Sequence, residues 1–155
     1  MSEIRYTLVE GTGRGKELPM AADQYFARRG GKFVKLSAGA VNLAGSADDI
    51  FGWCETAKDD TGKNSWKSVS GDTAFVYYAD PENVFEIPVK ESAASLAASQ
   101  VGLSFKCVTV GATYAMTQYA LVSNTATAAA GLNVVDVDTT NKTVRVKVDP
   151  RHRQN

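Results

Sequence analysis

The sequence has very few of the residues on which hydrolytic and metal-dependent chemistry depends. Its 155 residues include one histidine, His152, and two cysteines, Cys54 and Cys107. Two thiols cannot form a disulfide framework or a four-thiolate zinc site, and a nucleophilic triad would have to take its base from the C-terminal tail. We therefore expect no metal, no cofactor and no catalytic residue, and two buried thiols in a reducing cytoplasm.

The chain also lacks an excess of charge of either sign. Lys and Arg number 17, Asp and Glu number 17, and the formal net charge is zero. Because a basic surface supplies much of the affinity for nucleic acids, this balance argues against a nucleic-acid partner. Hydrophobic residues make up 44% of the chain and charged residues 22%, a composition that favours a folded domain over a disordered segment.

Long hydrophobic runs are missing as well. Residues 1–9 mix Glu3 and Arg5 into a short apolar pattern and lack the apolar core of a signal peptide. Residues 107–135 carry no charge, but Thr, Gln, Ser, Asn and Gly interrupt them throughout, so no membrane span is expected. An uncharged stretch of this length in a β protein predicts a face that contacts another protein.

A glycine-rich segment, residues 11–16, invites comparison with a phosphate-binding loop. Three residues separate Gly11 from Gly15 where that loop needs four, and Glu17 follows Lys16 where a hydroxyl is needed. The segment is better explained as a flexible hinge. We therefore expect residues 1–19 to form an extended N-terminal arm that carries a short strand from Ile4 to Val9 and that either packs on its own domain or reaches a neighbour.

Carboxylates offer two further possibilities. Asp136 and Asp138 begin like an EF-hand loop, but Asn141 stands in the glycine position and Lys147 in the glutamate position, which predicts ordinary turn carboxylates. A paired-carboxylate hydrolase stays open as the weakest alternative, although no spacing demands it. Its candidate residues are Asp48, Asp49, Asp59, Asp60, Glu86 and Glu91.

The rest of the sequence predicts β structure. Apolar or alternating segments, separated by turn residues every 8–12 positions, favour an all-β fold: a single small barrel or sandwich, β-tulip-like, of about eight short strands. The predicted strands are 33–36, 50–54, 73–78, 85–89, 103–110, 114–122, 132–138 and 143–148.

Four further features complete the expected architecture. Pro88 predicts that its strand lies at an edge or ends there. One short helix is expected over Ala93–Val101, capped by Ser92 and ended by Gly102. The barrel domain is expected over residues 20–149, followed by a flexible tail over 150–155. No internal repeat is apparent.

Several residues are candidates for contact with another molecule. Trp66 lies in the polar segment 55–71 and predicts either an interface anchor or a side chain folded over the barrel mouth. Ile4–Val9 is suited to adding a strand to the sheet edge of a neighbour. The predicted contact residues are Ile4, Tyr6, Leu8, Val9, Trp66, Tyr114, Met116 and Tyr119.

Four segments together resemble a known family. Residues 51–57 (FGWCETA), 71–76 (GDTAFV), 95–102 (SLAASQVG) and 131–148 resemble segments of the capsid decoration, or cement, proteins of tailed bacteriophages. The resemblance covers residues 24–149. It implies a small β-barrel or β-tulip domain, often a homotrimer and without catalysis, that binds the outer surface of the virus head and clamps adjacent subunits of the major capsid protein.

The resemblance also implies a location. The chain would be made in the cytoplasm of the bacterial host and would end on the outer capsid surface of the virion. The alternative is a carbohydrate- or receptor-binding β module of a phage fibre or tail, in which Trp66 and the tyrosines stack on sugars.

Overall fold

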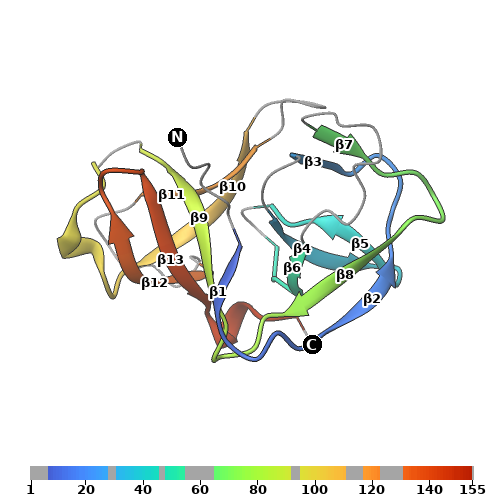
Figure 1. Cartoon of the computed structure of the whole chain (residues 1–155), viewed down its shortest axis with the longest axis horizontal. Helices are drawn as coiled ribbons and strands as arrows, with labels where there is room; N and C mark the ends of the chain where they lie inside the picture. Colours follow the sequence, from blue (N-terminus) through green and yellow to red (C-terminus); the bar gives the residue numbers. More distant parts are fainter. Residues whose placement is uncertain are drawn as a thin grey trace.

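The computed structural model describes residues 7–27, 31–45, 48–54, 65–91, 95–110, 117–122 and 131–154. These residues form thirteen strands and two single turns of 3-10 helix, arranged as two lobes side by side (Figure 1). The expected all-β fold built around a small barrel is confirmed. None of the described helices is long and apolar enough to cross a membrane.

The first lobe, here called the N-terminal barrel, is built around a five-stranded sheet of order β2-β8-β6-β4-β5. Met20, directly after β2, forms a parallel bridge with Val41 in β5, which closes the sheet into a ring. A separate pair, β3 and β7, belongs to the same lobe. The strands are β2 (Gly15–Pro19), β3 (Tyr25–Ala27), β4 (Lys32–Ser37), β5 (Ala40–Leu43), β6 (Gly52–Cys54), β7 (Ser65–Lys67) and β8 (Thr73–Tyr78).

The second lobe, the C-terminal barrel, is a closed ring of five strands. Its order is β9-β11-β10-β12-β13, and β13 pairs again with β9. An extra strand, β1, lies on the edge of β9 next to the point where β11 begins to pair. The strands are β1 (Leu8–Glu10), β9 (Val84–Lys90), β10 (Ser104–Val110), β11 (Thr117–Leu121), β12 (Leu132–Asp138) and β13 (Thr143–Val148).

The two barrels have the same topology. With the five ring strands of each numbered in chain order, the ring runs first, third, second, fourth, fifth in both. The first and third strands are parallel in both barrels, and all other neighbours are antiparallel. The expectation of no internal repeat is therefore wrong: β2, β4, β5, β6 and β8 correspond to β9, β10, β11, β12 and β13.

The correspondence extends to the register of the strands. The amide of Met20 donates to the carbonyl of Asp72 at 2.8 Å, and the amide of Val89 donates to the carbonyl of Lys142 at 3.0 Å. When Met20 is aligned on Val89, the sequence Glu-Leu-Pro-Met of residues 17–20 falls on Glu-Ile-Pro-Val of residues 86–89. Four residues are too few to reveal a repeat in the sequence alone, but they occupy matching positions in the two rings.

The matching prolines show why Pro88 does not mark an edge. β9 pairs with β13 through Pro88, so the strand lies inside the sheet and that prediction is wrong. The prolyl nitrogen faces the other side of β9, where the neighbouring strand changes from β1 to β11. A missing N–H is tolerated at this point because no ladder hydrogen bond is due there.

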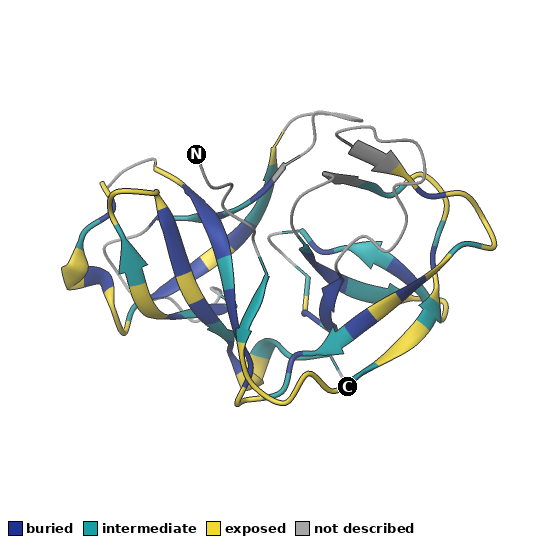
Figure 2. Cartoon of the chain, in the orientation of Figure 1, coloured by how far each residue is buried: buried dark blue, intermediate teal, exposed yellow. Residues whose placement is uncertain are grey.

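Each barrel encloses an apolar core of alternating inward residues (Figure 2). The two cores are joined by aromatic side chains. Phe33 and Trp53, on the outer face of the N-terminal barrel, pack on Phe85 of the C-terminal barrel with ring centroids 5.4 and 5.3 Å apart. All three side chains are fully buried. The barrels therefore form one packed body.

The positions of Phe33 and Trp53 carry different residues in the second copy of the module. Phe33 pairs with Trp53 across β4 and β6 as Ser104 pairs with Asn133 across β10 and β12. At those matching positions, the Ser104 hydroxyl donates to the amide oxygen of Asn133 at 2.9 Å. The outer face by which the N-terminal barrel packs on its neighbour is thus aromatic, whereas the equivalent outer face of the C-terminal barrel is polar.

Three expected features are corrected. Residues 95–97 are not helical, and only Ala98–Gln100 form a 3-10 turn, in which the Gln100 amide group bonds the backbone of Ala97 and Ser95. Ser92 and its two successors lie outside the described residues. Residues 8–19 are not a free arm, because β1 pairs with β9 and β2 with β8. Residues 150–154 are packed rather than flexible, as described below.

Candidate interaction surfaces

A buried glutamine connects the barrels through hydrogen bonds. Gln118 in β11 is 3% exposed, and its amide oxygen accepts from the backbone N–H of Phe33 at 2.6 Å. Its amide nitrogen donates to the carbonyls of Phe33 and Ala44 at 3.0 and 3.2 Å. Part of the uncharged stretch 107–135 thus faces the chain's own other barrel. Nothing in the sequence around Gln118 indicates this role, because its partner lies 85 positions away.

The C-terminal segment closes the N-terminal barrel in a similar way. The Gln154 amide accepts from the N–H of Leu36 and donates to its carbonyl, both at 2.8 Å. Ile50 donates to the carbonyl of His152, and the N–H of Gln154 donates back to the carbonyl of Ile50, each at 2.8 Å. Asp149 begins this segment and accepts from the backbone and guanidinium of Arg151. Pro150–His152 form the second 3-10 turn, and Arg153 then forms a single parallel bridge with Ile50, so the C-terminal segment is held against the N-terminal barrel.

The glycine-rich segment is fixed by one buried residue. Asn83 is fully buried, accepts from the N–H of Thr12 at 3.0 Å and donates to the carbonyl of Tyr78 at 2.7 Å. Gly11 has a φ of +130° and lies so close to Asn83 that a Cβ would collide with it. The segment is a tight connection between β1 and β2, and no phosphate-binding loop is formed.

The structure describes the side chains of three predicted contact residues, Leu8, Val9 and Tyr119. Ile4, Tyr6, Tyr114 and Met116 lie outside the described residues. Trp66 lies in β7, but its side chain belongs to the part that is not described. Leu8 and Val9 in β1 are half-buried, with Leu8 packed against the core, and Tyr119 in β11 is also half-buried. The structure brings β1 and β11 to the same edge of β9, at different points along it.

An aromatic pair, the exposed Phe75 and the half-buried Tyr77, lies on the outer face of β8. Phe75 is 40% exposed and packs edge-to-face on Tyr77 with ring centroids 5.2 Å apart. Next to Phe75 in β2 is Glu17, which accepts from the hydroxyl of Thr73 at 2.7 Å. β8 lies between β2 and β6 in the sheet, and the outward position of Phe75 leaves this part of its outer face exposed.

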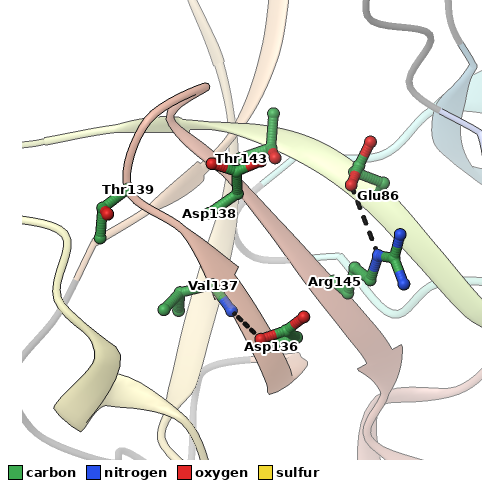
Figure 3. Close-up of a pocket in the computed structure, with 7 residues that line it drawn as sticks. All are labelled: Glu86, Asp136, Val137, Asp138, Thr139, Thr143 and Arg145. Atoms are coloured by element: carbon green, nitrogen blue, oxygen red, sulfur yellow. Dashed lines mark hydrogen bonds and ion pairs between the residues drawn. The ribbon is translucent and has the colours of Figure 1, made fainter.

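A polar depression of about 320 Å³ lies on the outer face of the C-terminal barrel (Figure 3). Arg145 donates to Glu86 at 3.5 Å across it. The Asp138 carboxylate accepts from the N–H groups of Thr140 and Asn141, and the N–H of Asn141 is the main reason that its pKa is lowered. The lining residues are Glu86, Asp136, Val137, Asp138, Thr139, Thr143 and Arg145.

Burial favours the neutral form of two titratable side chains, Cys107 and Lys32. Burial raises the pKa of the Cys107 thiol well above its usual range. Burial lowers the pKa of Lys32 to about 8, and its ammonium group donates to the carbonyl of Tyr25 at 3.0 Å. Within the described ranges no three His, Cys, Asp or Glu side chains gather as a metal site.

Comparison with family models, with curated proteins and with solved structures found no match.

Proposed function

We propose that this chain is a non-enzymatic structural protein of a phage virion, which binds the outer surface of the head and clamps adjacent major capsid subunits. The observation that carries the proposal is the rigid joining of two equivalent modules in one chain. Two matching modules held at a fixed distance suit a partner whose surface repeats, because binding of the first module raises the effective concentration of the second.

The resemblance to decoration proteins supports the same function. Three of its four segments fall on ring strands: residues 51–54 include β6, residues 73–76 lie in β8, and residues 131–148 span β12 and β13. The fourth, residues 95–102, contains the Ala98–Gln100 turn that precedes β10. A protein that binds only the assembled lattice stabilises it by mass action, without a reactive group. The homotrimer that the resemblance implies is part of the proposal, and light scattering of the purified protein would test it.

The test is a binding experiment with heads assembled from the major capsid protein encoded in the same genome. The purified chain should co-sediment with expanded heads, saturate at a fixed ratio to capsid subunits, and raise the temperature at which the heads open. Unexpanded heads, whose lattice spacing differs, are the control. Absence of binding to expanded heads would refute the proposal.

A second function is favoured by the exposed Phe75 and the half-buried Tyr77 beside it. Aromatic faces beside a carboxylate and a hydroxyl, here Glu17 and Thr73, are a common arrangement for stacking on sugars. A carbohydrate-binding fibre module would bind defined glycans on an array, and Phe75→Ser would abolish that binding. Trp66→Ala tests the contribution of the other aromatic candidate.

A further inference from the structure

The edge of β2 is open where the matching edge of β9 is covered. In the antiparallel ladder with β8, hydrogen bonds join Met20 to Asp72 and Tyr78 to Arg14. Bonded pairs alternate along such a ladder, so the backbone groups of Lys16 and Leu18 face β8. Those of Gly15 and Glu17 therefore point the other way, toward solvent at the outside of the lobe (Figure 2).

In the C-terminal barrel, the matching edge of β9 binds an extended segment of the chain itself. Glu86 matches Glu17, and its backbone N–H donates to the carbonyl of Thr7 at 2.8 Å. Here β1 lies antiparallel on β9, with Leu8 opposite Phe85. An extended segment thus completes the edge in one copy of the module.

In the N-terminal barrel no described residue takes that place. The β4–β5 hairpin reverses at Ala38 and Gly39, and β5 touches the first strand only through the bridge from Val41 to Met20. Gly15 and Glu17 lie before that bridge. Pro19 ends the open edge, since it has no N–H to offer.

We propose that the β2 edge at Gly15 and Glu17 accepts an extended segment of the major capsid protein, bound antiparallel as β1 is bound to β9. This inference rests on the function proposed above and names its contact. The position that matches Phe85 is Lys16, which is exposed. The segment therefore carries an acidic side chain opposite Lys16, because opposite charges stabilise directly paired positions on neighbouring strands.

The contact is small but repeated. Two residues contribute the donors and acceptors, and main-chain hydrogen bonds provide affinity in strand addition. A single such site binds weakly, whereas many sites on one lattice bind together if the protein itself is multivalent.

The test uses a pair of substitutions at one position. Glu17→Pro removes the outward N–H, while Glu17→Ala keeps it and loses the same carboxylate. Glu17→Pro should weaken binding to expanded heads at least tenfold relative to Glu17→Ala. Lys16→Glu, a change at an exposed side chain that leaves the fold intact, should weaken binding similarly. Circular dichroism and thermal melts establish that each variant is folded.

A second measurement needs no variant. On the free protein the amides of Gly15 and Glu17 should exchange rapidly with deuterium and those of Lys16 and Leu18 slowly. On decorated heads Glu17 should become protected. If wild-type protein binds heads while Glu17→Pro binds equally well and Glu17 stays unprotected, the edge assignment is wrong and the proposed function stands. If wild-type protein does not bind, both are refuted.

Discussion

Replacing Gln118 with methionine should weaken the whole molecule, because this side chain joins the two barrels. Methionine has nearly the same volume and shape, so packing changes little. The substitution removes the acceptor of the Phe33 N–H and the donor to two carbonyls. The Phe33 carbonyl keeps the N–H of Ala44, at 3.1 Å. The principal loss is therefore the acceptor of one buried N–H, that of Phe33. The carbonyls of Phe33 and Ala44 each lose one hydrogen bond in addition.

The size of the effect follows from these contacts. A buried donor left without a partner costs about 1–3 kcal/mol, and each remaining hydrogen bond contributes about 1 kcal/mol. We expect the free energy of unfolding to fall by about 3–5 kcal/mol. With a typical urea m-value of about 2 kcal/mol/M, the midpoint should fall by about 1.5–2.5 M. Such a loss is a large part of the total stability of an ordinary domain.

Urea unfolding followed by two probes provides the test. Tryptophan fluorescence reports on the buried Trp53 and on Trp66, and far-UV circular dichroism reports on all strands. Because Phe33, Trp53 and Phe85 share one core, both signals should change in a single transition in wild type and variant. The matched substitution Gln24→Met removes one acceptor, that of the Leu43 N–H, and should cost only about 1 kcal/mol. A loss below about 0.5 kcal/mol for Gln118→Met, or separate wild-type transitions for the two signals, would contradict this reasoning.

Three further substitutions test the remaining contacts. The hydrogen bonds from the Arg151 side chain and backbone hold the pKa of Asp149 down to about 2, so its stabilisation is present above about pH 4 and is lost as the pH falls toward 2. Asp149→Asn should lower stability at pH 7 by about 1–2 kcal/mol, since Arg151 is solvent-exposed, and flatten the acid limb of an unfolding profile. Gln154→Ala should lower the free energy of unfolding by about 1 kcal/mol and speed deuterium exchange at Leu36. Unchanged exchange would argue against the hydrogen bonds between the Gln154 side chain and the backbone of Leu36. Gly52→Ala should cost about 1–3 kcal/mol or more, because the new Cβ would collide with the carbonyl of Tyr77, and a wild-type melting temperature would refute that contact.

The sequence predicted strands best where one chain segment carried its own pattern. The strands over 73–78, 132–138 and 143–148 have the predicted bounds because alternating apolar residues and a turn specify each of them locally. β2 was missed because its glycines and charges suggest a hinge, and its strand conformation depends on β8, some 60 positions later.

The repeated architecture was beyond sequence reasoning for a related reason. The ring order depends on which strands pair, and the pairing positions fall between residues far apart in the chain. The likeness of residues 17–20 to residues 86–89 is only four residues long, since inward positions tolerate any apolar side chain that preserves the volume. The contact role of Gln118 was hidden in the same way, because an isolated glutamine in a strand has no local signature.

The unequal faces of the two modules limit how far this architecture can grow. The aromatic face of the first module packs on the second in a head-to-tail manner, and such contacts, when every unit carries them, propagate into open filaments. In the C-terminal barrel, Ser104 and Asn133 occupy the positions that match Phe33 and Trp53. The polar face of the C-terminal barrel therefore does not offer a further module the aromatic contact that the N-terminal barrel offers to Phe85.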